Sequence, residues 1–297
     1  MTLDAPYPKT RAEFDELFPT EASCLDYYRK LRWPDGIRCL KCGGSDGWLA
    51  SRSRWVCAQC KREQSVTVGT LLHRTRYPLK TWFRVMWQIC EQKNGISALG
   101  LQRAMGFGSY HTALEWLRRI RGVMVLPGRS RLTGEVEVDE TFVGGVKHGV
   151  RGRGAAGKVL VLVAVEVRGS KIGRARLKII SDATGPTVLD AVEDLVEPAS
   201  NVVTDGMASY ALLPGRGYNH TVSRPSTSEV GEHPLPKAHR VASLLKRWLL
   251  GTHQGGVTAK HLQAYLDEFV FRFNRRTSRS RGLLFRRLIE QTIEGRG

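Results

Sequence analysis

Hydrophobic positions in the first part of the chain recur with the period of a helix. Residues 1–34 show this spacing and predict a short helical lead-in segment. The same period returns over residues 78–126, with breaks at Asn94 and Gly106, so we expect one longer helix followed by two short amphipathic helices. Ser109 stands where the last of these helices begins, and its side chain suits an N-cap.

Beyond a break at Pro127-Gly128 the pattern changes to one typical of strands. The run at residues 159–167 is nearly continuous in apolar residues, which is typical of a strand buried on both faces. The pattern predicts three strands, a helix, a strand and then helices, the order that an RNase H-like α/β domain requires. In that order the elements are expected at 134–145, 159–167, 175–180, 186–196, 201–204 and from 236 onward, with a loop at 251–256.

Two C-x-x-C pairs lie between the first helical segments, and they consist of Cys39, Cys42, Cys57 and Cys60. A tetrahedral zinc ion needs four converging thiolates, and a C-x-x-C turn presents two of them at once. The spacing between the pairs is close to that of known zinc sites. We therefore expect a zinc ribbon with a structural Zn²⁺, because four thiolates leave no position for water. The alternative is four unrelated buried cysteines.

The overall charge is strongly basic, because 46 Lys and Arg against 28 Asp and Glu give a formal net charge of +18. Such a chain attracts polyanions, and nucleic acid is favoured over an anionic membrane because the basic residues do not gather on one amphipathic helix. The first residues are acidic and polar, unlike a signal peptide, so we expect a cytoplasmic protein. Cys24 and Cys90 are expected as buried apolar residues.

The second short helix carries four candidates for DNA contact. It forms, with the helix before Gly106, the spacing of a helix-turn-helix, whose second helix enters the major groove of DNA. A plain helical hairpin would show a similar pattern. The four candidates are His111, Arg118, Arg119 and Arg121.

Two aspartates stand at strand positions that suit metal chemistry. Asp139 lies among valines in the first expected strand, and Asp205 follows the short strand at 201–204. Adjacent strands would place these carboxylates side by side, where they could hold the divalent ions that accelerate phosphodiester cleavage. Alternatively, Asp139 faces solvent on an edge strand, and Asp205 caps a helix that begins near Met207.

Two glutamates are rivals of Asp139 for this role. With the strand period of two, Glu137 shares a face with Asp139, and Glu140 points to the other face. The strand pattern therefore keeps Glu137 as the nearer rival.

Two basic stretches are expected to contact the DNA backbone. The segment from Gly152 to Lys158 has the spacing of a P-loop, but Val159 replaces the required Ser or Thr, and a strand follows where a helix should begin. A basic Gly-rich loop is therefore favoured over an ATP site. The basic residues concerned are Arg151, Arg153 and Lys158 in this loop and Arg275 and Arg276 in a later cluster.

The chain closely resembles insertion-sequence transposases of family fifteen-ninety-five. The resemblance runs from about Arg38 to Arg276 and includes the zinc ribbon and the motifs GEVEVDETFVGG, VVTDGMASY, HRVASLLKRWLLGTHQG and HLQAYLDEFVFRFNRR. It implies an RNase H-like catalytic domain, Mg²⁺- or Mn²⁺-dependent strand cleavage at the terminal inverted repeats of a mobile element, and insertion into target DNA. It also implies a bacterial, nucleoid-associated protein.

The acidic residues of the family carry over one at a time. The first falls on Asp139 in VDET, and the second falls on Asp205 in TDG. Many relatives place a glutamate seven residues before a lysine that precedes a G-T turn; here the lysine matches Lys246, and the glutamate position holds His239. A neutral imidazole can coordinate a metal, although it is a softer ligand than Mg²⁺ or Mn²⁺ usually selects.

His239 and Lys246 would share one face of a helix if that helix begins at or before His239. Lys246 could then hold a phosphate near the metals. The alternatives are a helix-entry residue at His239 and a solvated charge at Lys246. Glu268 is another candidate for the third carboxylate, unless it pairs with Arg272.

The sequence thus predicts an α/β protein of five segments. They are a helical lead-in (1–34), a zinc ribbon (35–70), a helical DNA-binding domain (75–126), an RNase H-like catalytic domain (132–276) and a basic C-terminal tail (277–297). Because strand transfer must hold two element ends, we expect a homodimer or higher oligomer on double-stranded DNA. Two other functions stay open: a zinc-ribbon DNA-binding regulator whose catalytic domain has decayed, and an RNase H-type nuclease that cuts RNA or hybrids.

Overall fold

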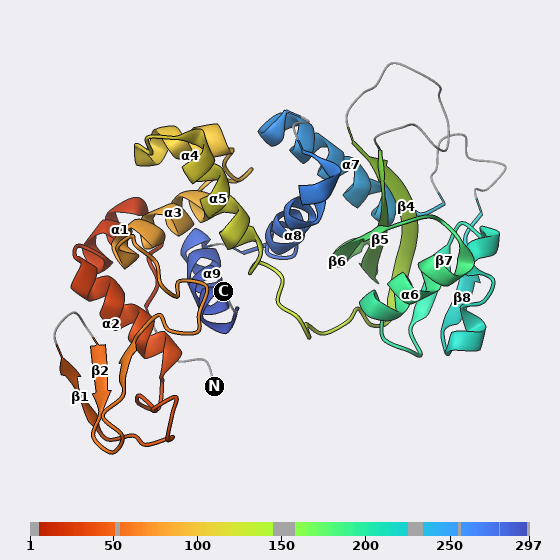
Figure 1. Cartoon of the computed structure of the whole chain (residues 1–297). Helices are drawn as coiled ribbons and strands as arrows, with labels where there is room; N and C mark the ends of the chain where they lie inside the picture. Colours follow the sequence, from red (N-terminus) through yellow and green to blue (C-terminus); the bar gives the residue numbers. More distant parts are fainter. Residues whose placement is uncertain are drawn as a thin grey trace. The chain divides into compact units, whose positions relative to one another are not determined.

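The computed structural model of the 297-residue chain divides into two compact units (Figure 1). The N-terminal unit consists of residues 1–126 and 278–297, and the second unit consists of residues 127–277. The structure describes residues 6–50, 54–144, 158–224, 234–254, 257–278 and 280–295. Among these residues, no helix combines the length and the apolar character needed to cross a lipid bilayer.

An aromatic core holds four helices of the N-terminal unit together. These helices are α1 (Arg11–Leu17), α2 (Glu21–Arg32), α3 (Leu79–Glu91) and α9 (Arg281–Glu294). The ring centroid of Phe14 lies 5.2 Å from that of Phe18, 5.0 Å from Trp87 and 5.5 Å from Phe285. These separations are in the range where aromatic pairs attract one another beyond simple burial.

Helix α9 corrects the expectation of a basic tail at residues 277–297. Its Phe285 is fully buried in the aromatic core. At Gly282 a Cβ atom would lie 1.5 Å from the carbonyl oxygen of Pro8, so the close approach of this helix requires glycine. The basic composition of the segment hides an apolar stripe at helical spacing, formed by Leu284, Phe285, Leu288 and Ile289.

Two short helices follow α3, namely α4 (Ala98–Met105) and α5 (Tyr110–Arg121). Gly106 ends α4 at a φ of +65°, and the Ser109 hydroxyl accepts a hydrogen bond from the N–H of Thr112 to cap α5. Both positions confirm the sequence prediction. The ring of Trp116 in α5 stacks on Trp82 in α3 with a centroid distance of 3.8 Å, which fixes α5 against α3.

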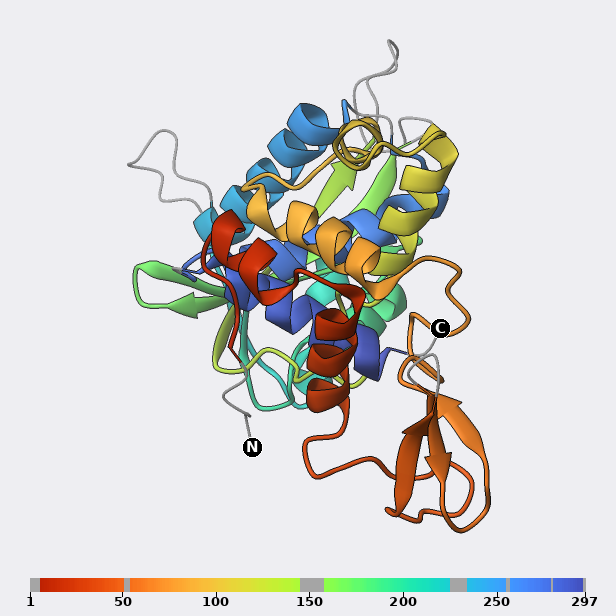
Figure 2. The same cartoon turned by 90° about the vertical axis from the view of Figure 1, so that its left-hand side faces the viewer.

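A three-stranded antiparallel sheet follows α2 within the N-terminal unit (Figure 2). Its strands are β1 (Gly47–Ala50), β2 (Arg54–Cys57) and β3 (Glu63–Ser65). Strand β2 ends at Cys57, the third of the four predicted cysteines. At Gly47 a Cβ atom would lie 2.3 Å from the carbonyl oxygen of Val56, so glycine allows the tight pairing of β1 with β2.

The second unit is built around a five-stranded sheet in the order β6-β5-β4-β7-β8 (Figure 1). Its strands are β4 (Glu135–Val143), β5 (Val159–Arg168), β6 (Lys171–Ile180), β7 (Asn201–Thr204) and β8 (Asn219–Val222). Strands β4, β5 and β6 pair antiparallel, while β7 pairs parallel with both β4 and β8. The first four strands confirm the prediction. Strand β8 has no predicted counterpart, because Asn-His-Thr-Val is short and largely polar.

Helices cover both faces of this sheet. They are α6 (Gly185–Leu195) on one face and α7 (Pro236–His253) and α8 (Leu262–Phe273) on the other. Val136 and Val138 of β4 join the core beneath α6, whereas Val161 and Val163 of β5 join the core beneath α7 and α8. Both faces of β5 are thus buried, as its continuous apolar run predicts. Helix α7 continues into the loop expected at 251–256.

Single-turn 3₁₀ helices occupy three of the connections. They are η2 (Ala208–Tyr210), η3 (Pro214–Arg216) and η4 (Ala259–His261). The first of them matters for the site, because it directly follows the segment that begins with Asp205.

Candidate active site and zinc centre

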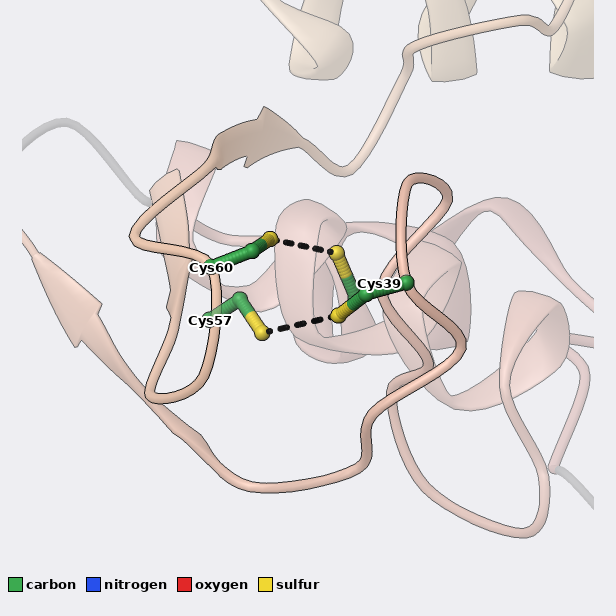
Figure 3. Close-up of side chains that lie close together, drawn as sticks. Cys39, Cys57 and Cys60 are labelled. Carbon is green, nitrogen blue, oxygen red and sulfur yellow. Dashed lines mark hydrogen bonds between the residues drawn. The ribbon is translucent and has the colours of Figure 1, made fainter.

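The four predicted cysteines converge beside the three-stranded sheet (Figure 3). Their Sγ atoms all lie within 4.8 Å of one another. The Sγ atoms of Cys39 and Cys60 are 3.5 Å apart, and those of Cys42 and Cys57 are 3.6 Å apart. Four thiolates bound at about 2.3 Å around a tetrahedral ion lie roughly 3.8 Å apart. The donor set therefore fits a structural Zn²⁺ and leaves no position for water.

Backbone and side-chain groups prepare this cluster for a metal. The backbone N–H of Cys42 makes the largest contribution to lowering the pKa of the Cys39 thiol to about 6, because it stabilises the thiolate. The amide of Gln64 holds the first cysteine turn, since it accepts from the N–H of Leu40 and donates to the carbonyl of Arg38, both at 3.0 Å. Gln64 lies outside the C-x-x-C pattern, so the sequence did not single it out.

Asp139 lies on β4, and Asp205 directly follows β7, the strand that pairs parallel with β4. The register of β4 and β7 sets Glu137 opposite Val203. Continued by two residues, this register brings Asp205 level with Asp139. Asp139 is half-buried and Asp205 is exposed. The edge-strand interpretation of Asp139 is wrong, because β4 is the central strand of the sheet.

Each of these two carboxylates also accepts a hydrogen bond from a backbone N–H close by in the sequence. Asp139 Oδ1 accepts a hydrogen bond from the N–H of Glu140 at 2.9 Å, and Asp205 Oδ1 accepts one from the N–H of Met207 at 3.1 Å. The turn held by Asp205 leads into η2. Asp205 is not the N-cap of η2, because that position belongs to Met207 and carries no side-chain hydrogen bond; its Oδ1 closes the turn before it.

Glu137 lies on the face of β4 that packs against α7, but its carboxylate is already engaged. The residue is only 4% exposed. Its Oε2 accepts from the backbone N–H of Lys237 at 2.7 Å and of Ala238 at 2.8 Å, and the Lys237 ammonium lies 3.6 Å from Oε1. The first N–H groups of a helix have no partner within the helix, and an anion stabilises them. Glu137 is thus the anchor of α7.

Glu140 points to the opposite face of β4, as the strand period predicts. Its Oε1 accepts a hydrogen bond of 2.7 Å from the hydroxyl of Tyr210, which is fully buried in the core beneath α6. Burial raises the pKa of Glu140, and the carboxylates of Asp139 and Asp205 raise it further, because like charges disfavour ionisation. The three acidic side chains therefore form one electrostatic cluster.

His239 and Lys246 both lie on α7, which begins before His239, so the condition for a shared helical face is met. Both side chains are exposed. Partial burial lowers the pKa of Lys246, while the Asp139 carboxylate acts in the opposite direction, so Lys246 lies within electrostatic range of Asp139. Over the described residues, Asp139, Asp205 and His239 do not form a metal-binding group of the kind that the four cysteines form.

Glu268, the other candidate for a third carboxylate, is 1% exposed on α8. The guanidinium of Arg272 lies 2.9 Å from its Oε1. The structure thus supports the pairing of these two residues over a role for Glu268 in metal binding.

The arginines proposed for DNA contact on α5 are largely engaged within the N-terminal unit. Arg121 is 1% exposed, so the expectation that it contacts DNA is corrected to a place in the core. Arg119 donates to a backbone carbonyl at 2.6 Å, and Arg118 pairs with Glu115 at 2.5 Å. His111, in contrast, is exposed in the first turn of the helix. His111 at the start of α5 and Arg119 near its end are therefore the exposed members of the four candidates.

In the second unit, some of the proposed basic residues make contacts within the unit, and another is exposed. Arg275 donates to a carbonyl of α8 at 3.1 Å, and Arg276 donates to a carbonyl of α8 at 2.9 Å and to one of β6 at 3.2 Å. These contacts tie the end of α8 to the sheet. Lys158 is exposed, and Arg151 and Arg153 lie outside the described residues.

Comparison with protein families covers both parts of the candidate site. The family described as the ISXO2-like transposase domain matches residues 131–274, and the family described as the transposase zinc-ribbon domain matches residues 19–63. A comparison with curated proteins finds no match. The two family matches define the class as a DDE-type transposase that carries a zinc ribbon. The chain belongs to the insertion-sequence family fifteen-ninety-five (IS1595), as its sequence resemblance indicates.

Proposed function

We propose that this transposase binds the terminal inverted repeats of an insertion sequence and catalyses metal-dependent cleavage and joining of DNA strands. The observation that carries the proposal is the parallel pairing of β4 with β7 within the matched transposase domain, because its register, continued by two residues, sets Asp205 level with Asp139. Paired carboxylates are the ligands that Mg²⁺ and Mn²⁺ prefer. Such ions supply activation of the attacking oxygen and stabilisation of the leaving oxygen.

The arrangement of strands supports an RNase H-like fold for the second unit. Three antiparallel strands are followed by α6 and then by β7, which returns parallel to β4. This topology puts the ends of the first and fourth strands next to each other. A pair of acidic residues at those ends can therefore act on one phosphodiester group.

We assign His239 and Lys246 to the rim of the same site. The ammonium of Lys246 lies in the field of Asp139 and is exposed, so it can hold a DNA phosphate there. His239 would complete the ligand set through a neutral imidazole. Because imidazole is a softer ligand than a carboxylate, we expect Mn²⁺ to support more activity than Mg²⁺.

Basic groups in both units are assigned to DNA binding. The capped helices α4 and α5 have the arrangement of a helix-turn-helix, and this supports DNA contact at the start of α5. The assigned residues are His111, Arg118, Arg119, Arg151, Arg153, Lys158, Lys246, Arg275 and Arg276. Two element ends must be held together during strand transfer, so the active form is a dimer or higher oligomer on DNA.

Strand nicking of a duplex that carries the element ends tests the proposal. Wild-type protein is expected to nick in Mn²⁺ and to require the ion, whereas Asp139→Ala and Asp205→Ala lose nicking and retain duplex binding. Unchanged nicking by either variant would contradict the assignment of that aspartate as a metal ligand.

A decayed DNA-binding regulator is the second candidate function, favoured by the histidine at the third position and by the incomplete convergence of the three ligands. It predicts specific duplex binding with no nicking in any divalent ion. Cleavage of RNA or hybrid substrates without cleavage of DNA ends would favour a third reading, an RNase H-type nuclease.

A further inference from the structure

We propose that the hydrogen bond between Tyr210 and Glu140 is a positioning contact that fixes Asp205 against Asp139. The proposal rests on the function proposed above and assigns a role to two residues that are not themselves metal ligands. Glu140 directly follows Asp139 in the sequence. Through its bond to Tyr210, it fixes the position of the segment that carries Asp205.

The contact joins the two segments that directly follow the aspartates. Glu140 is the residue after Asp139 on β4, and Tyr210 ends the single turn of η2 that follows Asp205. The ladder between β4 and β7 extends only to Glu137 and its partner on β7. The backbone pairing therefore stops before it reaches either aspartate. The 2.7 Å bond between Tyr210 and Glu140 supplies a cross-connection beyond that end.

Hydrogen bonds between near neighbours in the sequence stiffen the segment from Thr204 to Tyr210, so that a shift of Tyr210 also shifts Asp205. The hydroxyl of Thr204 accepts from the N–H of Gly206 at 3.1 Å, and Asp205 Oδ1 accepts from the N–H of Met207 at 3.1 Å. The N–H of Tyr210 in turn donates to the carbonyl of Met207 at 3.0 Å. Displacement of Tyr210 would thus displace the backbone of Asp205.

Two opposing forces give the bond its importance. Asp139 and Glu140 on β4 and Asp205 after β7 are acidic groups on neighbouring segments, and like charges on these segments repel one another. The ring of Tyr210 is fully buried in the core beneath α6, so its hydroxyl is held in place. A buried hydrogen bond to a carboxylate is among the stronger contacts of its kind. It therefore opposes the repulsion at the point where the backbone ladder has ended.

The chain offers a matched control for removing this hydroxyl. Tyr218 is also buried, and its hydroxyl donates to the carbonyl of Val196 at 3.0 Å, away from β4. Tyr210→Phe and Tyr218→Phe each remove one buried hydroxyl from the same side of the sheet. The two variants should lose similar thermal stability, but only Tyr210→Phe should change the metal site.

The experiment measures Mn²⁺ binding by electron paramagnetic resonance titration of the full chain, and DNA nicking as a function of Mn²⁺ concentration. Tyr210→Phe is expected to raise the half-saturating Mn²⁺ concentration about tenfold in both measurements, the loss of one hydrogen bond to a charged group. Nicking at saturating Mn²⁺ should fall less, because excess ion offsets weaker binding. Tyr218→Phe should stay within about twofold of the wild type.

Substitutions at Glu140 complete the test. Glu140→Gln keeps an oxygen that accepts from Tyr210, so it should remain closer to the wild type than Glu140→Ala. Adding Tyr210→Phe to Glu140→Ala should cause no further loss, because the contact has already gone. The inference is overturned if Tyr210→Phe behaves like Tyr218→Phe, or if its effect adds in full to that of Glu140→Ala.

The aspartate variants separate this inference from the proposed function. If Asp139→Ala and Asp205→Ala bind Mn²⁺ and nick DNA as the wild type does, the proposed function fails. If both variants lose binding and nicking while Tyr210→Phe matches the wild type, only the positioning role is wrong.

Discussion

The carboxylate of Glu137 lies 2.8 Å from the backbone nitrogen of Ala238, a residue 101 positions later in the chain. This bond joins the strand that carries Asp139 to the start of the helix that carries His239 and Lys246. The position of α7 therefore depends on a residue of β4 that holds no metal. The same short strand segment positions two different partners, because Glu140 on the other face binds Tyr210.

Removal of the Glu137 carboxylate is expected to destabilise α7. Glu137→Ala leaves two buried N–H groups without an acceptor, which costs about 2–4 kcal/mol. Denaturant unfolding of the full chain measures this loss, and nicking should fall with it. Lys237→Ala is the control, because it removes only the side chain of the ion pair and should cost less than about 1 kcal/mol. Equal stability of the two variants would show that Glu137 does not anchor the helix.

The cysteine cluster is expected to hold one Zn²⁺ per chain. Cys39→Ser and Cys60→Ser should lose the metal and unfold the ribbon, because the small sheet has little core of its own. Metal analysis of purified protein and release of zinc on thiol modification check this. Cys90→Ala is the matched control, since Cys90 is buried in α3 outside the ribbon and should leave the zinc content unchanged.

A methyl group at Gly282 should destabilise the N-terminal unit. The added Cβ would clash with the carbonyl of Pro8, and the helix α9 would have to move away from α1, at a cost of at least about 2 kcal/mol. Thermal unfolding followed by tryptophan fluorescence reports on this unit through Trp87. Gly215→Ala is the control, because its Cβ would meet no atom within 4 Å. An unchanged melting temperature for Gly282→Ala would contradict the placement of α9.

Substitution of His239 should show whether this residue is a metal ligand or only stands at the start of α7. If His239 completes the metal site, His239→Ala lowers nicking on the order of a hundredfold, which corresponds to about 2.7 kcal/mol. His239→Glu supplies a hard oxygen ligand, so it should restore nicking and shift the preference toward Mg²⁺. Comparison of nicking rates in Mg²⁺ and Mn²⁺ checks this. Wild-type rates for His239→Ala would assign the residue to the entry of α7 only.

The acid stability of the second unit should depend on Glu166. Burial alone would raise the pKa of this carboxyl, but hydrogen bonds from Arg174, at 2.5 Å and 2.9 Å, and from the N–H of Thr133 lower it to about 2. The folded pKa therefore lies below the ordinary value of 4.5. The stabilisation is present above that pH and is lost as the pH falls toward the folded pKa.

Glu166→Gln should accordingly lower the free energy of unfolding at neutral pH and flatten its decline between about pH 4.5 and pH 2. Denaturant unfolding at a series of pH values measures both effects. Glu135→Gln serves as the control, because Glu135 is exposed at the start of β4 and should leave the profile unchanged. Parallel profiles for the wild type and Glu166→Gln would disprove the role of this ion pair.

Local signals in the sequence were sufficient for much of this molecule. Close cysteine spacing predicts the cluster, because two tight turns already bring the thiols into pairs. Alternation of valines with charged residues predicts β4, and apolar runs predict β5 and β7, but the sequence left open whether β4 lies at an edge of the sheet. The adjacency of Asp139 and Asp205 follows once those strands are placed in one sheet.

Features that depend on a distant partner could not be predicted in this way. The burial of Arg121 and the engagement of Glu137 are decided by helices that the local pattern does not place. The basic residues of the segment 277–297 led to the prediction of a tail, although its apolar stripe determines how α9 packs. Tyr210 ends the motif VVTDGMASY, but the sequence assigns it no role, because its importance comes from a single bond to Glu140.

Helix α9 also sets the order in which the protein can mature on the ribosome. The N–H of Leu71 donates to the carbonyl of Thr292 at 3.0 Å, so the N-terminal unit includes a segment that is translated after the whole second unit. Residues 127–277 have their whole core before that helix is made. N-terminal domains usually fold first during synthesis, but here the N-terminal unit cannot be completed until residues 127–277 have been made. A nascent chain can therefore close the core of the second unit before the unit that carries the zinc ribbon receives α9.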